Sequence, residues 1–529
     1  MFEPHHFSSF LLLLLLLLLP WLLLLLNNKI FSFQKLSPSP SKSHDSRLPS
    51  SYPLIGSFFA IRKHLNDPLN WISDTLRSSP SSTFILHVPL GDRQIFTANA
   101  ANVEHILKTH FENYHKGSTL TSILHDLLGH GIFNTNGHEW KFQRQVASHE
   151  FNTKSLRKFV ETVVDAEFNH RLIPILSDAA KNGTVLDLQD ILKRFAFDNI
   201  CQIAFGHDPD CLSPSFPECQ FAAAFDKAIE ISTHRLRSLF PFAWKVERLL
   251  NIGSEIKLQK AVSEVREFAR KLVRQKKNAM DGQKHNSLPD SNLDLLSRFL
   301  KSGLVDEQFV TDIVISFILA GRDTTSSALT WFFWLLSGNP GVEDQILKEI
   351  TEMNSNGCIS EERSVYEEIK HMVYTHASLC ESMRLYPPVP IDTKEAVSDD
   401  VLPDGTKVKR GMRVIYHPYA MGRSDKLWGE EWPEFRPERW LDRENGVAGK
   451  WRFVPRDPYS YPVFQAGPRI CLGKEMAFLQ MKRLVAGVLR RFRVVPVAEN
   501  GFEPVYVPYL TAMMKGGFPV KIEERIAMM

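Results

Sequence analysis

A single cysteine, Cys471, lies between Gly467 and Gly473 and two residues after Arg469. Glycine at position 467 lets the backbone turn tightly or bulge, and glycine at 473 lets it pass close to a bulky planar group. The residues from Leu472 onward have the pattern of a helix, so we expect Cys471 at a helix N-terminus, where the free N–H groups and the dipole favour a thiolate. The segment therefore predicts a thiolate beside an arginine that can meet a carboxylate.

An iron porphyrin suits both groups, because its iron has an axial site for a thiolate and its propionates can meet the arginine. A buried cysteine in a turn is the commoner fate of a single cysteine, and Cys471 alone would favour that alternative. The joint presence of Phe464, Gly467, Arg469, Cys471 and Gly473 favours haem binding instead.

Residues 464–473 resemble the haem-binding signature of the cytochrome P-450 superfamily, the haem-thiolate monooxygenases. The resemblance extends over roughly residues 50–525 and implies a mainly α fold with a small β portion. It also implies haem b with Cys471 as the axial thiolate, which pushes electron density toward O–O cleavage. The other haem-contacting residues that it implies in this segment are Phe464, Gly467, Arg469 and Gly473.

No flavin or nicotinamide site is evident in the sequence, so the resemblance implies electrons from NADPH through a separate flavoprotein reductase. The expected helix after Cys471 carries several cations that would suit an acidic partner, although a solvated helix face is the alternative. These cations are Lys474, Lys482, Arg483, Arg490 and Arg491.

Residues 306–337 are predicted to form one helix, about 48 Å long at 1.5 Å per residue. Gly321 near its middle costs about 1 kcal/mol relative to alanine, and a flat ligand lying against the helix would explain it. Thr324 can bond back to a carbonyl one turn earlier and leave a pocket for water. A kinked core helix is the alternative for this motif alone. The family keeps its oxygen-activation motif here, and the resemblance implies that Asp323 and Thr324 manage proton delivery.

Two further motifs match the family. Glu381 and Arg384 lie one turn apart on a predicted helix, and Arg439 precedes the cysteine by 32 residues. An exposed pair of this kind would contribute little, but the family joins these three residues into a buried triad that locks the cysteine loop.

Trp140 and Arg144 share a helix face at positions i and i+4, and their counterparts in the family contact the haem propionates. Lys394 matches a position that is often basic and serves the same purpose, although a surface lysine is the alternative.

A leucine-rich run at residues 10–26 predicts a membrane anchor. As a helix it would be about 26 Å long, close to the roughly 27 Å hydrocarbon core of the endoplasmic reticulum. A cleaved signal peptide is the alternative, but no small-residue cleavage site follows the run. Because basic residues follow it, the positive-inside rule leaves the rest of the chain in the cytosol. We therefore expect an anchor at residues 1–29, a Pro- and Ser-rich linker at 30–56 and a catalytic domain at 57–529.

The remaining sequence predicts a mostly helical body. Residues 83–88 and 93–98 have the signal of a β-hairpin, and short strands are expected again near residues 406–416, 493–497 and 519–522. The polar tract 276–292 is expected to be a loop. The net charge of +3 and the spread of basic residues argue against nucleic-acid binding.

Local sequences also indicate the substrate class. Residues 111–117, 131–140, 386–394 and 461–467 look like the plant branch of the superfamily that hydroxylates fatty acids at or near the terminal (omega) methyl. Relatives within that branch oxidise jasmonoyl-isoleucine instead. Attack on a methyl requires a narrow channel that admits only the chain end. Candidate lining residues, each with a plain core role as the alternative, are Phe133, Phe317, Ala320, Val389 and Ile391.

The rival class is a haem-binding or peroxide-using protein of the same fold without reductase-driven turnover. The intact pair Asp323 and Thr324 disfavours it, because peroxide-using relatives can dispense with that pair.

Overall fold

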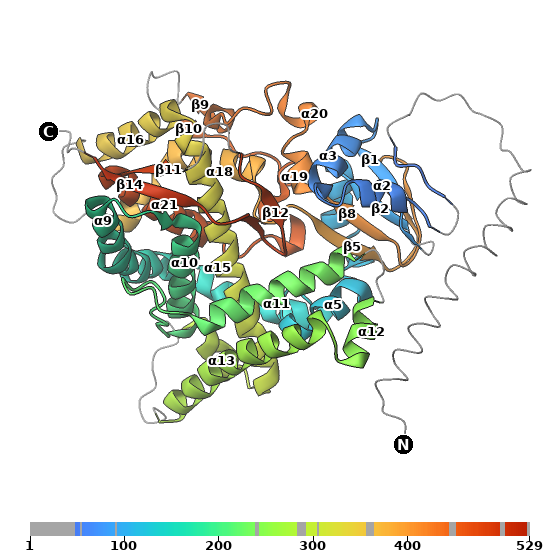
Figure 1. The fold of residues 1–529 in the computed structure, drawn as a ribbon, viewed down its shortest axis with the longest axis horizontal. Coiled ribbons are helices and arrows are strands. Elements are labelled where there is room, and N and C mark those ends of the chain that lie inside the picture. The colour runs from blue at the N-terminus through green and yellow to red at the C-terminus, as the bar shows by residue number, and fades with distance from the viewer. Residues whose placement is uncertain are drawn as a thin grey trace, which may run out of the picture. The chain divides into compact units, whose positions relative to one another are not determined.

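The longest helix, α15 (Glu307–Ser337), runs through the body of the protein, and other helices pack around it (Figure 1). This computed structural model describes residues 48–52, 55–89, 93–238, 243–282, 293–303, 306–355, 364–443, 451–497 and 503–525. The expected membrane anchor and most of the expected linker lie outside these residues.

The helix α15 forms where the sequence predicts it. The side chain of Asp306 caps it by accepting a 2.6 Å hydrogen bond from the backbone N–H of Phe309, which satisfies one of the free donors of the first turn. Three long helices, α10 (Leu188–Phe205), α13 (Ser254–Gly282) and α18 (Val373–Leu385), contact it. Such a helix is buried on nearly all sides, which explains its apolar sequence.

The other α-helices surround this centre. They are α2 (Phe58–Lys63), α3 (Pro68–Ser78), α4 (Ala100–Glu104), α5 (Ser118–Leu128), α6 (Gly137–Ser148), α7 (Thr153–Lys158), α8 (Asp165–Glu167), α9 (Ile173–Asn182), α11 (Gln220–Arg237), α12 (Ala243–Leu250), α14 (Leu295–Lys301), α16 (Pro340–Ser355), α17 (Val365–Lys370), α19 (Pro418–Met421), α20 (Asp425–Trp428) and α21 (Lys474–Arg491). Three π-helical segments are η2 (His105–Thr109), η5 (Phe159–Val164) and η6 (Phe168–Leu172). The short 3-10 turns are η3 (Phe111–Asn113), η4 (His149–Phe151), η8 (Pro437–Trp440), η10 (Pro462–Phe464) and η11 (Gly467–Arg469).

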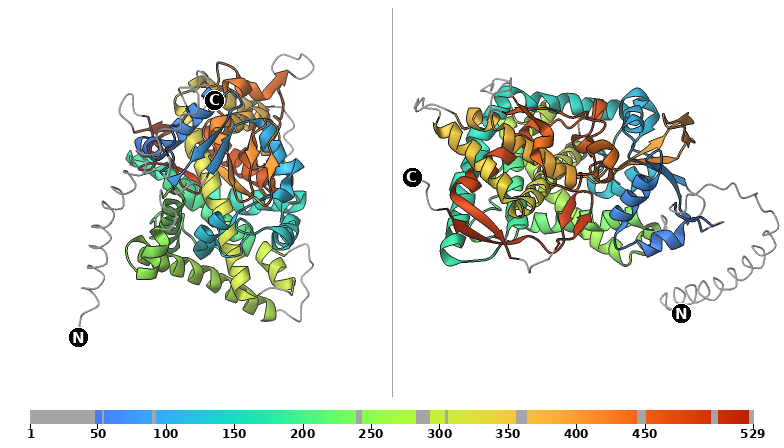
Figure 2. Two further views of the ribbon diagram at one scale, coloured as in Figure 1. Left: turned by 90° about the vertical axis from the view of Figure 1, so that its right-hand side faces the viewer. Right: turned by 90° about the horizontal axis from the view of Figure 1, so that it is seen from above.

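The main sheet has five strands in the order β1-β2-β8-β5-β3 and lies at one end of the described body, beside α3 (Figures 1 and 2). The predicted hairpin is present as an antiparallel pair, whereas β2 pairs with β8 in parallel. The strands of this sheet are β1 (Thr83–His87), β2 (Arg93–Thr97), β3 (Tyr114–His115), β5 (Asp392–Ala396) and β8 (Arg413–Tyr416).

The smaller sheets join segments that are distant in sequence. Strand β14 pairs with both β11 and β4, and it ties the end of the described chain to the start of α10. The strands are β4 (Leu186–Asp187), β6 (Asp400–Val401), β7 (Lys407–Val408), β9 (Leu441–Arg443), β10 (Trp451–Phe453), β11 (Phe492–Pro496), β12 (Tyr506–Pro508), β13 (Ala512–Met514) and β14 (Pro519–Glu524). The described residues therefore have the predicted mainly helical fold with a small β portion.

One local prediction is wrong in the part that the structure describes. The polar tract 276–292 is expected to be a loop, but α13 continues to Gly282, and residues 283–292 lie outside the described residues. The charged residues here lie on a helix whose other face packs its apolar side chains against α11 and α15. A helix needs only one apolar stripe, so polar composition alone does not end it. Within the described ranges, no helix combines the length and the apolar character needed to cross a bilayer.

Candidate functional site

The loop around Cys471 closes on itself. The N–H of Cys471 donates a 2.8 Å hydrogen bond to the carbonyl of Phe464. Gly467 has a φ of +63°, and a Cβ at this position would lie 2.1 Å from the carbonyl oxygen of Leu107. Both the backbone conformation and the close approach of η2 therefore require glycine. At Gly473 a Cβ would be in ordinary contact with Phe151, so the protein alone does not require glycine there.

The helix α21 begins at Lys474, two residues later than the expected start at Leu472. Gly473 is its N-cap residue, so Cys471 lies in the turn that leads into the helix rather than in its first turn. Burial is the strongest influence on this thiol and raises the pKa of Cys471, against the N–H of Gly473 and the charges of Arg144 and Lys474. The protein's own groups therefore do not by themselves favour the predicted thiolate, and a bound metal cation would stabilise it.

Cys471 nevertheless has accessible surface, although protein atoms surround it closely enough to desolvate it. Arg144 lies close enough to Cys471 for each residue to influence the pKa of the other.

A second accessible patch lies in the middle of α15. From Val310 to Phe333 every residue of this helix is buried except Ala320, Gly321 and Thr324, which are partly exposed. These three residues share one face of the helix, since they lie at positions i, i+1 and i+4. The hydroxyl of Thr324 donates a 2.6 Å hydrogen bond to the carbonyl of Ala320, as the sequence predicts. The centre of the protein therefore contains open space against this face.

The reason for Gly321 differs from the one that the sequence suggests. A Cβ at this position would lie 2.5 Å from the side chain of Ile200 on α10. Glycine thus allows α10 and α15 to approach closely, and this packing accounts for its cost to the helix without a ligand. Gly321 does mark a close approach to the helix, but the approaching group is α10.

The carboxylate of Asp323 has an ion pair that the sequence does not predict. Arg322 donates a 2.8 Å hydrogen bond to Asp323 and a 2.6 Å hydrogen bond to Asp226 on α11, and both Arg322 and Asp323 are buried. Burial raises the pKa of Asp323 above its usual value, although the charge of Arg322 opposes this shift. A carboxyl group with a raised pKa holds a proton more readily than an exposed one, which suits a group in a proton relay.

Glu381, Arg384 and Arg439 lie together. Glu381 and Arg384 are completely buried and form two hydrogen bonds, of 2.7 and 2.8 Å, and Arg439 reaches Glu381 at 3.2 Å. The indole N–H of Trp440 donates a further 2.9 Å bond to Glu381. Trp440 in turn packs against Tyr461, the residue that precedes η10, with ring centroids 4.7 Å apart. The triad is therefore connected to the start of the cysteine loop.

Three cations lie near Asp392. Lys394, which is 2% exposed, donates a 2.8 Å hydrogen bond to Asp392, so it is not a surface lysine. Lys116 lies 3.8 Å from the other oxygen of Asp392. Arg469 lies over the ring of Trp140, 4.4 Å from its centroid, and its pKa is lowered by burial to about 10.

Lys116 is not among the site residues predicted from the sequence. Desolvation is the main cause that lowers the pKa of Lys116 to about 7, and the charges of Lys394 and Arg469 lower it further. Against burial, which would raise it, Lys116 and Lys394 hold the pKa of Asp392 well below its usual range. One anion cannot balance Lys116, Lys394, Arg469 and the nearby Arg144, so this region suits an anionic ligand.

Comparison with known proteins identifies the family. The model of the family described as "Cytochrome P450" (cytochrome P-450) matches residues 47–519. The chain belongs to the cytochrome P-450 family. Cytochrome P-450 94A2 of Vicia sativa is 60% identical over 92% of this chain and 93% of its own length. Cytochrome P-450 94A1 of Vicia sativa is 59% identical, over 90% and 91%, and cytochrome P-450 94B3 of Arabidopsis thaliana is 49% identical, over 94% and 96%.

The cytochrome P-450 family binds haem through a cysteine thiolate and receives electrons from a reductase. The residues of this chain fit that group in three respects. Cys471 has accessible surface, α15 has a partly exposed patch at Ala320, Gly321 and Thr324, and Lys116, Lys394 and Arg469 lie around the carboxylate of Asp392. A flat, anionic, metal-bearing ligand meets all three requirements.

Among the candidate channel residues of this cytochrome P-450, Phe317 is buried and lies one turn before Ala320 on α15. Phe133 is 37% exposed, whereas Val389 and Ile391 are half-buried. The carbonyl of Pro388, beside Val389, accepts a 2.8 Å hydrogen bond from the N–H of Ala512. The structure therefore sets the 386–391 segment beside the β12–β13 hairpin.

Three of the five cations that follow Cys471 have partners within the protein, and the surface for an acidic partner stays a prediction. Lys482 is buried and donates a 3.2 Å hydrogen bond to the carbonyl of Lys370. Arg483 pairs with Asp165, and Arg490 pairs with Glu368. These acidic partners come from distant segments, so the charge pattern of α21 alone could not reveal them.

Proposed function

We propose that this protein hydroxylates fatty acids at or near the terminal (omega) methyl, with electrons from NADPH delivered by a separate flavoprotein reductase. The proposal is supported by the local sequences that resemble the plant fatty-acid branch and by the partly exposed residues Ala320, Gly321 and Thr324 of α15, where the end of an acyl chain could lie. Haem, held by Cys471, would supply the activation of dioxygen. The flanking Phe464, Gly467 and Gly473 would shape the loop around it.

The proton chemistry is assigned to Asp323 and Thr324. Thr324 presents its hydroxyl at the open patch, where it can hold a water or pass a proton. Asp323 lies beside it in the chain, and its pKa is raised by burial, so it holds a proton more readily than an exposed carboxyl group. The cations Lys394, Arg144 and Arg469, with Trp140, are proposed to hold the haem propionates.

The apolar side chains of α15 near Ala320 favour an apolar substrate. The buried side chains of α15 that precede Ala320 are mostly apolar, and Phe317 belongs to the same hydrophobic cluster as Leu319. A linear acyl chain could bury its methyl end there while its carboxylate stays near the entrance. Relatives of the plant branch oxidise jasmonoyl-isoleucine, a smaller amphiphile that requires similar end-on attack, and this remains the alternative substrate.

The test is a product analysis with the haem-loaded protein, reductase and NADPH. Saturated fatty acids of increasing length and jasmonoyl-isoleucine are supplied separately, and mass spectrometry locates the new hydroxyl. We expect oxidation at the terminal methyl or its neighbour for every chain length. Oxidation at a constant distance from the carboxylate, or only of jasmonoyl-isoleucine, would overturn the substrate assignment. Oxygenated product that forms with peroxide but not with reductase would support the rival class without reductase-driven turnover.

A variant sharpens this test. Val389→Ala enlarges a proposed channel wall and should move part of the product inward along the acyl chain. A discrimination of about 1–3 kcal/mol is involved, so a mixture of positions is expected. The control is Leu402→Ala, which shortens a side chain in the buried cluster beside the main sheet and should leave the product position unchanged.

We also propose that residues 10–26 anchor the protein in the endoplasmic reticulum membrane as a single span, with the catalytic domain in the cytosol. The leucine-rich sequence and the basic residues that follow it support this assignment. Fluorescence microscopy of the tagged full-length protein, with a protease-protection assay of isolated membranes, tests it. A soluble protein, or a protected catalytic domain, would contradict it.

A further inference from the structure

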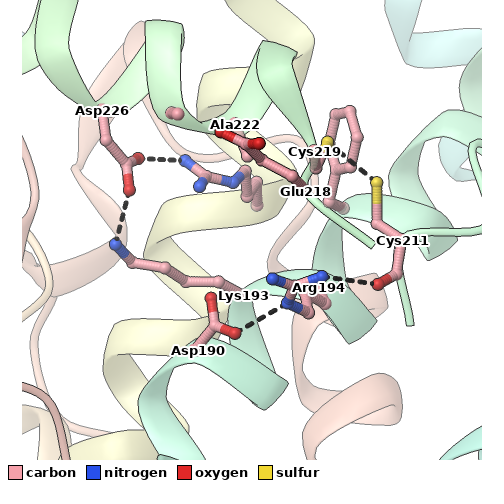
Figure 3. Close-up of a pocket in the computed structure, with 11 residues that line it drawn as sticks. Asp190, Lys193, Arg194, Cys211, Glu218, Cys219, Ala222 and Asp226 are labelled. Atoms are coloured by element: carbon pink, nitrogen blue, oxygen red, sulfur yellow. Dashed lines mark hydrogen bonds and ion pairs between the residues drawn. The ribbon is translucent and has the colours of Figure 1, made fainter. Parts of the chain in front are cut away.

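A pocket of about 190 Å³ lies between α10, α11 and α15, apart from the open patch at Thr324 (Figure 3). Two cysteines line it. Figure 3 shows the sulfur atoms of Cys211 and Cys219 pointing toward each other. The remaining side chains are mainly charged, and those that matter here are Arg194, Asp226 and Arg322.

The two thiols are close enough to react with each other. The Sγ atoms of Cys211 and Cys219 are 2.9 Å apart, and a disulfide bond is about 2.05 Å long. The sulfurs therefore need to approach by only about 0.9 Å.

The backbone between the cysteines is held in place. Arg194 donates hydrogen bonds of 2.9 Å to the carbonyls of both Cys211 and Pro217, and the N–H of Cys211 is bonded to the carboxylate of Asp198. Formation of the Cys211–Cys219 disulfide therefore requires little movement of this backbone.

The chemical environment favours one thiol as the nucleophile. The hydrogen bond from Cys211 is the main cause that lowers the pKa of Cys219 to about 7, and the charge of Arg322 contributes. Cys219 is the residue that precedes α11, where the free N–H groups also favour a negative charge. By contrast, burial raises the pKa of Cys201 and Cys380, so these thiols react poorly.

We propose that Cys211 and Cys219 are a redox-active dithiol that hydrogen peroxide oxidises to an intramolecular disulfide. The thiolate of Cys219 attacks one oxygen of the peroxide, the O–O bond breaks, and a sulfenic acid and hydroxide form; the hydroxide takes up the proton that Cys219 released and becomes water. The thiol of Cys211 then attacks the sulfenic sulfur, the S–S bond forms, and a second water leaves with the proton of Cys211. In total, two thiols lose two protons and two electrons, and one peroxide becomes two waters.

The disulfide changes the structure beside the catalytic helix. It joins the segment after α10 to the start of α11, and so it removes the thiolate charge from the surroundings of Arg322. Arg322 keeps its pairs with Asp226 and Asp323. The oxidised protein should therefore have a more rigid beginning of α11, while its haem site stays intact.

The experiment uses the full-length, haem-loaded protein, first reduced and then freed of reductant. It is treated with a small excess of hydrogen peroxide, alkylated, digested and analysed by mass spectrometry. We expect a cross-linked peptide pair containing Cys211 and Cys219, lighter by two hydrogens than the sum of the free peptides and lost after dithiothreitol treatment. Hydrogen exchange in the first turn of α11 should slow several-fold in the oxidised form. The absorption of the reduced carbonyl complex should be retained, which shows that Cys471 is unchanged.

Matched variants complete the test. Cys211→Ser and Cys219→Ser should each abolish the cross-link, and Cys380→Ser should retain it. In Cys211→Ser the thiol at position 219 should become over-oxidised, because no second thiol resolves its sulfenic acid. The proposal is overturned if the wild-type protein keeps both thiols, if Cys219 reaches sulfinic acid without cross-linking, or if the disulfide links two molecules. If the serine variants do not fold, the wild-type peptide map alone decides among these outcomes.

Discussion

Arg322 donates a 2.8 Å hydrogen bond to the carboxylate of Asp323, the next residue along α15. The same guanidinium nitrogen lies 2.6 Å from Asp226 on α11. Asp323, which is proposed to deliver protons, is thus paired with the adjacent Arg322, and Asp226 on α11 shares the same guanidinium group. Since the side chain of Asp226 is 35% exposed, the pair also has a connection toward solvent.

This connection makes the pKa of Asp323 adjustable from α11. After burial, the negative charge of Asp226 is one of the causes that raises it. Asp226→Asn should therefore lower the pKa of Asp323, so that the proton is lost at lower pH. If Asp323 donates a proton during turnover, the alkaline limb of the pH–rate profile should move to lower pH. An unchanged limb in the variant would mean that Asp323 does not limit proton delivery.

Removal of the proposed iron ligand gives the most direct spectroscopic test. Cys471→Ala deletes the thiolate, so the red-shifted absorption of the reduced carbonyl complex should disappear. The wild-type spectrum under identical conditions is the reference, and Cys380→Ala, a substitution of a buried cysteine outside the loop, should retain the band. Persistence of the band in the Cys471 variant would refute the ligand assignment.

Thr324→Ala removes the hydroxyl that bonds to the carbonyl of Ala320 at the open patch. Haem content and substrate affinity should remain near normal, because neither depends on this proton donor. Product formed per NADPH should fall, with the lost reducing equivalents recovered as peroxide and water. Thr324→Ser, which restores a hydroxyl, should recover much of the coupling. Equal coupling in all three proteins would assign Thr324 a purely structural role.

The buried triad predicts a large loss of stability. Glu381→Ala leaves Arg384 without its carboxylate partner at a site with no solvent exposure. The free energy of unfolding should fall by about 3–5 kcal/mol, a large share of a typical domain's stability. Chemical denaturation and the haem content of the purified protein measure this effect. Asp442→Ala, which removes an exposed ion pair with Arg452, is the control and should cost less than about 1 kcal/mol.

His417 predicts sensitivity to acid. Its Nδ1 accepts a 3.0 Å hydrogen bond from the N–H of Ala420, and burial lowers its pKa from 6.5 to about 3. Below pH 6.5 the unfolded chain binds a proton at this residue that the folded protein does not bind. Stability should therefore decline as the pH falls from 6.5 toward 3, by up to about 1.4 kcal/mol per unit.

His417→Asn tests this origin, because asparagine can still accept the bond from Ala420 but does not titrate. Denaturation measured across this pH range should show a shallower decline in the variant. His371→Asn, a substitution of an exposed histidine, should leave the decline unchanged. Parallel declines in the wild type and the His417 variant would show that other groups cause the acid sensitivity.

The sequence could predict features that depend on nearby residues. The start of α15 at its Asp306 cap, the bond from Thr324 to Ala320 and the hairpin of β1 and β2 all follow from short-range rules. Pairings across long loops could not be predicted in this way. Nothing near Lys116 in the chain indicates that Asp392 will lie beside it. Likewise, the acidic partners of Arg483 and Arg490 on α21 come from α8 and α17, which are distant in sequence.

Gly321 shows a different limit. Its cost to the helix correctly signals a close approach, but the same signal is expected from a ligand and from Ile200. Composition also misled at the end of α13, because charged residues suit a helix with one exposed face as well as a loop. Similarly, the electrostatic gain of a helix N-terminus at Cys471 is smaller than the cost of burial. In each case two opposing physical effects fit the same local sequence, and tertiary packing, which a single sequence does not show, decides between them.

The narrow exposure of α15 has a consequence for how this enzyme can change during evolution. Ala320, Gly321 and Thr324 span about 6 Å of helix. Thr324 is constrained by its proposed chemistry and Gly321 by the contact with α10, which leaves Ala320 as the position on this face that is free to vary. New substrate preferences must therefore arise mostly in segments off the helix, such as the β12–β13 hairpin and the stretch around Val389. The central helix would then stay constant while the loops around it diversify.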